Sequence, residues 1–307
     1  MKWKKLGLII EPKGYYWMVS HAQNPFPEKM DDSRYKIHFA GRNKDNLAHG
    51  GYAILDMKDP LAGCEVEEKP TITLGSAGCF DDCGVMPSCI VEQDGVKYMY
   101  TTGWTQARRT PFSFFIGLFI SRDGGDNWER YSLAPVLGRS FNDPYLSCSP
   151  WVIIENGVWR MWYVSGTGWE DEPFKAKPKH YYHIKYAESD DGIAWRNEGH
   201  VCIDYENEEY AIARPTVSFS DGLYRMWYCY RGGENTYRAG YAESRDGLEW
   251  TRKDGEVGID VSEDGWDSEM ICYPCMFHHD GDTYLIYNGN SFGSTGVGLA
   301  VLEKEGK

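Results

Sequence analysis

Acidic side chains recur at four corresponding places in the sequence, each a few residues before a proline that opens an apolar segment. The prolines are Pro87, Pro150, Pro215 and Pro274, and the acidic residues before them include Asp82, Asp143, Glu209, Asp267 and Glu269. Carboxylates that crowd into one site acquire different pKa values, so one can serve as an acid while another serves as a base. If these segments meet in space, we expect Asp82, Asp143 and Glu209 to be catalytic.

Arginine, aromatic and amide side chains accompany these acids, in a combination typical of a sugar-binding site. Aromatic faces stack on pyranose rings, while carboxylate, amide and guanidinium groups bind the hydroxyls. The predicted binding residues are His21, Arg42, Trp104, Trp169, Arg214, Arg231, Asp267, Glu269, Tyr273 and Asn290. Two alternatives stay open. The carboxylates can instead pair with the arginines and only neutralise a polar funnel, and His21 can be a core histidine rather than a group that holds a metal or a water.

Two repeated segments indicate the elements that position these residues. Segments 116–128, 184–195 and 239–250 each read as a strand followed by a Ser-x-Asp-Gly turn and a tryptophan, and segments 51–56 and 296–301 are shorter counterparts. A second repeat, strand–turn–strand, has its turn glycines at Gly95, Gly157, Gly222 and Gly281, at intervals of about 60 residues. Asp-Gly and Asn-Gly pairs favour tight hairpins.

The repeats predict an all-β fold, a five-bladed β-propeller formed as a single domain by residues 1–307. The expected blades cover residues 14–75, 84–135, 147–203, 212–262 and 271–303. Residues 3–10 form an apolar strand with no blade of its own, so we expect this strand to complete the last blade and close the ring. In this topology the hairpins lie on one face, and the acidic loops open on the other.

Composition excludes several classes of protein. The chain has 32 Lys and Arg against 46 Asp and Glu, a net charge of −14, which is the wrong sign for a nucleic-acid partner. The apolar run 6–10 is too short for a signal peptide, and no other run approaches a membrane span. Nine cysteines scattered through strand-like segments favour reduced thiols in a cytoplasmic protein. Cys79/Cys83 and Cys272/Cys275 leave a metal or redox site as the alternative, but we expect no metal and no cofactor.

The blade pattern and the acids before the inner strands resemble the five-bladed propeller glycosidases, the group containing glycoside hydrolase families 32, 43, 62, 68, 117 and 130. The resemblance implies an enzyme that cleaves a glycosidic bond of an oligosaccharide or glycan precursor, with two essential carboxylates and a third that tunes them. Asp82 matches the tuning position of the second blade, and Glu209 or Asp143 matches the acid of a later blade.

The sequence departs from this family pattern in the first blade. Family 43 enzymes place their base, an aspartate, beside the first inner strand, where this chain has Ser20-His21-Ala22-Gln23-Asn24-Pro25. Asp31 and Asp32 follow in a predicted hairpin that faces away. Two further hypotheses therefore stand beside hydrolysis. One is phosphorolysis as in family 130, with arginines such as Arg42, Arg214 and Arg231 holding phosphate, and the other is sugar binding without turnover.

Overall fold

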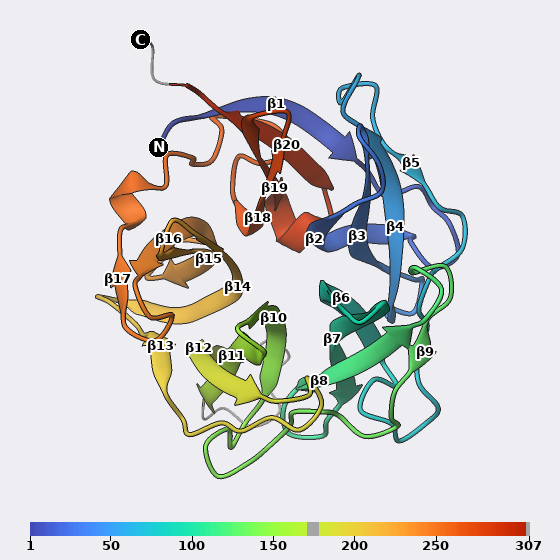
Figure 1. Cartoon of the computed structure of the whole chain (residues 1–307), viewed down its shortest axis with the longest axis vertical. Helices are drawn as coiled ribbons and strands as arrows, with labels where there is room; N and C mark the ends of the chain where they lie inside the picture. Colours follow the sequence, from blue (N-terminus) through green and yellow to red (C-terminus); the bar gives the residue numbers. More distant parts are fainter. Residues whose placement is uncertain (171–177, 305–307) are drawn as a thin grey trace.

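The computed structural model describes residues 1–170 and 178–304 and shows a nearly all-β chain whose strands surround a central axis (Figure 1). Antiparallel pairings join the described strands into successive units, which belong to one four-stranded and two eight-stranded sheets. The first strand of each unit lies nearest the axis, and the last lies at the periphery (Figure 1). The all-β propeller fold predicted from the sequence is therefore confirmed.

The units follow one another along the chain, with the N-terminal strand placed in the last. Their strands are β2 (Ser20–Lys29), β3 (Arg34–Arg42), β4 (Ala48–Asp56) and β5 (Glu65–Val66); β6 (Gly84–Gln93), β7 (Val96–Gln106), β8 (Phe112–Ser121) and β9 (Glu129–Arg130); β10 (Ser147–Glu155), β11 (Val158–Trp169), β12 (His180–Ser189) and β13 (Val201–Ile203); β14 (Glu209–Ser220), β15 (Leu223–Gly232), β16 (Arg238–Ser244) and β17 (Trp250–Arg252); and β18 (Cys272–His279), β19 (Asp282–Asn288), β20 (Val297–Leu302) and β1 (Trp3–Ile10). A 3₁₀ turn, η1 (Asp254–Glu256), and a short helix, α1 (Asn290–Gly293), complete the elements.

The predicted hairpin turns have the backbone geometry that their sequences require. Both central residues have positive φ in four of them, which are Asp94-Gly95, Asn156-Gly157, Asp221-Gly222 and Asp280-Gly281. Positive φ at both positions matches the right-handed twist of the flanking strands. In the Ser-x-Asp-Gly turns, Asp191 accepts hydrogen bonds from the amides of Ile193 and Ala194, both at 2.8 Å. Asp246 does the same for Leu248 and Glu249, so these turn aspartates stabilise the turn backbone.

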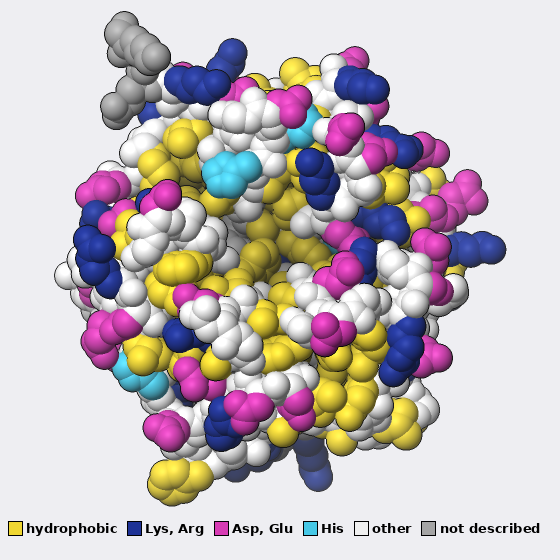
Figure 2. All heavy atoms as spheres, viewed as in Figure 1, with side chains coloured by type: hydrophobic (Ala, Val, Ile, Leu, Met, Phe, Trp, Pro, Cys, Tyr) yellow, Lys and Arg dark blue, Asp and Glu magenta, His cyan; other side chains and the backbone are white. Residues whose placement is uncertain are grey.

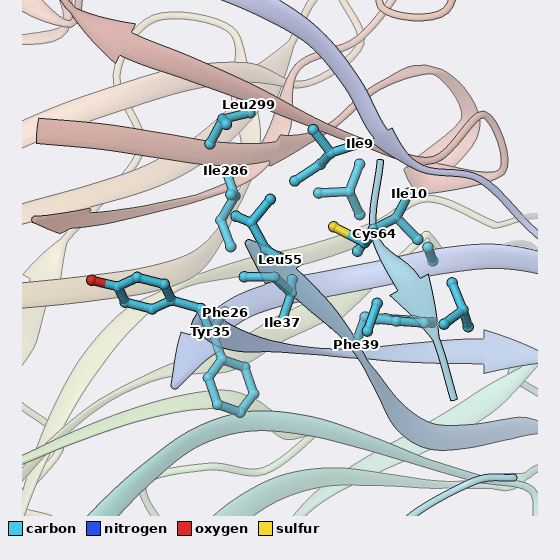
Figure 3. Close-up of a cluster of buried hydrophobic side chains, with 14 of the residues drawn as sticks. Ile9, Ile10, Phe26, Tyr35, Ile37, Phe39, Leu55, Cys64, Ile286 and Leu299 are labelled. Carbon is cyan, nitrogen blue, oxygen red and sulfur yellow. The ribbon is translucent and has the colours of Figure 1, made fainter. Parts of the chain in front are cut away.

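Strand β1 pairs with a strand of the last unit and shares a hydrophobic cluster with the first. It pairs antiparallel with β20, with Trp3 opposite Leu302. Ile9 and Ile10 are buried, and they belong to one cluster with Phe39 of β3 and Leu299 of β20 (Figure 3). The N-terminal strand therefore covers the edge of β20 and also contributes side chains to the core between the two units.

Charged side chains are mixed over the outer part of one face, and hydrophobic side chains gather around a hollow at its centre (Figure 2).

All nine cysteines are unpaired, and all but Cys83 are buried. Among the described residues, no three His, Cys, Asp or Glu side chains form a group that could hold a metal ion. Within residues 1–170 and 178–304, no helix is long and apolar enough to cross a bilayer.

Candidate functional site

Each inner strand is irregular beside a proline. The pairing register of β2, β6, β10, β14 and β18 shifts there, and the residues directly before the five prolines are Asn24, Met86, Ser149, Arg214 and Tyr273. Four of these have left-handed φ, with values of 57° for Asn24, 49° for Ser149, 57° for Arg214 and 55° for Tyr273. This conformation costs a residue other than glycine about 1–2 kcal/mol. Backbone strain of this kind concentrates at functional sites.

A cavity of about 230 Å³ is lined by four of these five pre-proline residues, all but Arg214. Its other lining residues come from neighbouring positions in the units: Gln23, Arg42, Thr102, Phe112, Phe114, Leu146, Cys148, Val164, His180, Tyr182, Ala213, Arg231, Tyr237 and Phe292. We call this space the central cavity. Pockets that bury drug-sized ligands measure about 300–1,000 Å³, so the central cavity suits one six-membered ring with its substituents.

Arg231, at the end of β15, is held on one wall of the central cavity by aromatic and imidazole groups. Its Nη2 donates to His180 Nε2 and to the Tyr182 hydroxyl, both at 3.3 Å. Its guanidinium lies 4.8 Å from the ring centroid of Tyr237 and 5.1 Å from that of Tyr210. Burial and the neighbouring Arg231 charge lower the pKa of His180 to about 4, so His180 is neutral at pH 7 and able to accept this bond. The Arg231 Nε is buried without a protein partner.

Arg42, at the end of β3, is fixed by two neutral amides. Its Nε donates to Gln23 Oε1 at 2.8 Å, and its Nη1 donates to Asn46 Oδ1 at 2.9 Å. Burial lowers the pKa of Arg42. No carboxylate within the described part of the chain forms an ion pair with Arg42 or Arg231. Both guanidinium charges therefore remain available to an anion.

The central cavity has the opposite charge to the whole protein. The chain carries a net charge of −14, yet the described lining of the cavity contains two arginines and no Asp or Glu. Asn24 adds an acceptor, because this residue is 5% exposed and its Oδ1 has no protein partner. The site can thus bind a negatively charged group and hydroxyl donors together.

A second cavity of about 300 Å³ shares four lining residues with the central cavity, which are Arg42, Met86, Phe112 and Phe114. We call it the outer cavity. Its remaining lining residues are Asp45, Asn46, Leu47, Trp104, Gln106 and Pro111. The two spaces are therefore neighbours with Arg42 at their junction, and the predicted binding residue Trp104 belongs to the outer one.

Asp143 does not line either cavity. Its buried carboxylate accepts hydrogen bonds from the Tyr163 hydroxyl at 3.0 Å, from Ser165 Oγ at 2.6 Å and from the Asn197 amide, and Lys185 Nζ lies 3.7 Å away. Tyrosines at the equivalent position of two other units do the same: Tyr228 donates to Asp254, and Tyr287 donates to Asp267. These carboxylates tie the connecting loops to their own blades.

The carboxylates of Glu209 and Asp82 also form hydrogen bonds with other groups of the protein. Arg252 holds both carboxylate oxygens of Glu209, at 2.7 and 2.8 Å. Asp82 Oδ2 accepts the Gly78 amide at 2.9 Å, while the adjacent, fully buried Asp81 pairs with Arg130 at 2.9 Å. Neither Glu209 nor Asp82 lines the central cavity. The structure does not bring the three predicted catalytic carboxylates together in that space, and their catalytic roles stay predictions.

The other predicted residues divide between the cavities and the surrounding framework. Arg42, Arg231 and Tyr273 line the central cavity. Asp267 pairs with Lys5 at 2.7 Å, and Asn290 accepts the backbone amides of Glu269 and Met270. Trp169 packs on Phe112 and His180. The His21 imidazole forms a hydrogen bond with the hydroxyl of Ser20. The fully buried Arg214 donates to the Ser88 carbonyl at 2.8 Å. Glu269 is exposed.

Sequence reasoning missed most of the residues that line the central cavity. Asn24, Met86 and Ser149 each precede a proline whose only evident role in the sequence is to mark where an inner strand begins. The position before each proline was the available signal, because a bulge there turns the side chain out of the regular alternation of the strand. His180, Tyr182 and Tyr237 lie beside or at the start of third strands and carry no comparable signal.

Among known protein families, no family model matches the chain. Solved structures with the same fold include one described as a BT0996 RGII complex, with a TM-score of 0.78 and 17% identity over 99% of this chain and 92% of the other. A thermostable family-43 glycoside hydrolase has a TM-score of 0.68 and 17% identity over 94% and 91%. A structure from work on mannoside phosphorylases and hydrolases of family 130 has a TM-score of 0.67 and 16% identity over 98% and 93%. The chain thus has the fold of the propeller glycosidases.

Two mycobacterial sequences are much more similar to the chain. They are the uncharacterized proteins MT1551 and Rv1502 of two Mycobacterium tuberculosis strains, CDC 1551 / Oshkosh and ATCC 25618 / H37Rv. Each is 40% identical over 305 residues, which cover 99% of this chain and all of the relative. At this identity and coverage, the chain belongs to the same protein family as MT1551 and Rv1502.

Proposed function

We propose that the protein recognises a carbohydrate and that one sugar unit occupies the central cavity. The observation that carries the proposal is a ring-sized cavity at the strained inner strands, lined by both aromatic and hydrogen-bonding side chains. Aromatic faces pack against the C–H face of a sugar, and convergent polar groups fix its orientation. The solved structures with this fold include glycoside hydrolases, which supports a saccharide as the ligand.

Different lining residues would contact different parts of the sugar. Asn24 Oδ1 and Arg231 Nε, an acceptor and a donor without protein partners, bind ring hydroxyls or a charged substituent. A buried polar group without a partner costs about 1–3 kcal/mol, so a ligand that satisfies these atoms recovers that cost. Phe112 and Phe114, whose rings stack with centroids 4.3 Å apart, supply the apolar wall.

Cleavage of a glycosidic bond is the second candidate, favoured by the fold. Hydrolysis in this mechanistic class uses two carboxylates on either side of the bond, and the described lining of the central cavity offers none. Phosphorolysis needs a phosphate site, and Arg42 and Arg231 have the chemistry for one. Hydrolysis with Asp82, Asp143 and Glu209 requires these acids to act from positions outside that lining.

The test is calorimetric titration of the protein with neutral and acidic monosaccharides and short oligosaccharides, combined with assays of aryl glycosides with and without phosphate. We expect at least one saccharide to bind, and Arg231→Gln to weaken that binding by about tenfold or more, because a hydrogen bond to a charged group contributes about 1.5–3 kcal/mol. Release of the aryl group would establish turnover, and its dependence on phosphate would identify phosphorolysis.

Arg122→Gln is the matched control, because Arg122 lies in an outer turn with its side chain 66% exposed. Thermal unfolding of both variants checks that the fold is retained. The proposal is wrong if no saccharide binds, or if Arg231→Gln and Arg122→Gln bind the saccharide equally well.

A further inference from the structure

If a sugar occupies the central cavity, as in the proposed function, Arg42 indicates the chemistry of the rest of the ligand. Arg42 is the one charged residue that lines both the central and the outer cavity within the described residues. Its guanidinium has five N–H groups, and the two hydrogen bonds that fix it go to neutral amide oxygens of Gln23 and Asn46. A fixed positive charge that forms no ion pair with a carboxylate of the described residues thus lies where the two cavities meet.

The position of this charge restricts the ligand. Because Arg42 lines both cavities, a ligand that extends from one to the other would lie beside its guanidinium, and a negative charge in the linkage between the two ends of the ligand would meet Arg42 there. A phosphodiester or diphosphate linkage has its charge there, whereas a uronic acid carries its carboxylate as a branch of one ring. Arginine binds phosphate oxygens in a bidentate manner, which favours phosphate at this junction.

The outer cavity favours a flat group at the far end of the linkage. Trp104 lies on its wall together with Phe112 and Phe114, and none of these side chains is fully buried. Aromatic side chains of this kind stack on nucleobases. Gln106 and the exposed Asp45 add acceptors for hydroxyl or amino groups of the same ligand.

We propose that the ligand is a sugar joined through phosphate to an aromatic base, the chemistry of a nucleotide-activated sugar. The sugar occupies the central cavity, the phosphate binds Arg42, and the base lies against Trp104. The protein's net charge of −14 repels such an anion in general, so its binding depends on the local arginines.

The experiment is a three-step calorimetric series on the full chain. Its probes are free glucose, galactose, mannose and N-acetylglucosamine, their 1-phosphates, and UDP-glucose, UDP-galactose, GDP-mannose and UDP-N-acetylglucosamine. For at least one sugar, we expect the 1-phosphate to bind about tenfold tighter than the free sugar, through the charge-assisted bonds to Arg42. We expect the nucleotide sugar to bind about tenfold tighter again, through stacking on Trp104.

Two variants assign these steps to residues. Arg42→Gln should abolish the gain from the phosphate, so that the 1-phosphate binds this variant no more tightly than the free sugar does, and Trp104→Leu should abolish only the gain from the nucleotide. Arg122→Gln and Tyr131→Leu are the controls, because the Arg122 side chain is 66% exposed in the turn after β8 and Tyr131, directly after β9, is 47% exposed. If either test variant unfolds, Arg42→Lys, which keeps the charge but loses the bidentate fork, and Trp104→Phe take its place.

The outcomes separate the two proposals. If free sugars bind but phosphate and nucleotide add nothing, this inference is overturned while the proposed function stands. If glucuronic or galacturonic acid binds more tightly than the sugar phosphates, and Arg42→Gln abolishes that binding, the anion is a carboxylate and the inference is again overturned. If no saccharide binds in any form, both proposals fail.

Discussion

The buried Asp143 carboxylate accepts hydrogen bonds from Tyr163, Ser165 and Asn197 of its own blade. Asp143→Asn replaces one acceptor oxygen by a donor that faces other donors, and a polar group buried without a partner costs about 1–3 kcal/mol. We therefore expect the free energy of unfolding, measured by urea denaturation, to fall by about that amount. Saccharide affinity should not change, because Asp143 does not line the central cavity.

Asp221→Asn is the matched control, because Asp221 lies in an exposed hairpin turn with φ of 54°, a conformation that asparagine tolerates. Its effect should stay within about 0.5 kcal/mol. If the protein cleaves a glycoside, and Asp143→Asn abolishes cleavage without loss of stability, the catalytic role predicted from the sequence is the correct one.

The inner strands are sheet strands that also contain strained residues where they line the central cavity. Ser149 precedes Pro150 with φ of 49° and lines the central cavity. Ser149→Gly removes a strain of about 1–2 kcal/mol, but glycine restores about 0.5–1 kcal/mol of chain entropy to the unfolded state. We expect the free energy of unfolding to stay equal or rise by about 1 kcal/mol, while saccharide affinity measured by calorimetry falls because a cavity hydroxyl is lost.

Ser218→Gly is the control for this prediction, since Ser218 occupies a regular position of β14 opposite Arg225. There glycine has no strain to relieve and should destabilise the protein by about 0.5–1 kcal/mol. Equal losses of stability in the two variants would show that the bulge at Ser149 stores no strain.

The elements also show which parts of the site the sequence could predict. Turn glycines and the Ser-x-Asp-Gly segments fix local backbone geometry, so strands and turns were predictable from local chemistry. The direction of the acidic side chains was not predictable, because it depends on partners distant in sequence. Asn197 binds Asp143, and Arg252 binds Glu209, and nothing near Asp143 or Glu209 in the sequence indicates these partners.

For the whole molecule, the propeller fold followed from the repeats, whereas the binding residues required coordinates. The site is assembled from single side chains of several units, and Arg42, Arg231 and Tyr273 are the predicted residues that reach the central cavity. A repeat identifies equivalent backbone positions. It does not indicate at which of those positions one unit has replaced a framework residue by a binding residue.

The packing of β1 between the last and first units can be tested by substitution. Ile9 is 4% exposed in the cluster that contains Phe39 and Leu299. Ile9→Ala should lower the free energy of unfolding by about 2–5 kcal/mol, because it leaves a cavity in the core. Lys4→Ala, at an exposed position of the same strand, should change it by less than about 0.5 kcal/mol. Similar losses in the two variants, measured by urea denaturation, would falsify this role for β1.

The pairing of β1 with β20 also has a consequence for how the protein is made. Trp3 leaves the ribosome long before its partner Leu302. Until β20 has been synthesised, the nascent chain holds an apolar segment without its partner strand. Contacts between such distant residues form slowly, and unpaired strand edges aggregate. The strand pairing that completes the last unit therefore forms only after nearly the whole chain has been synthesised.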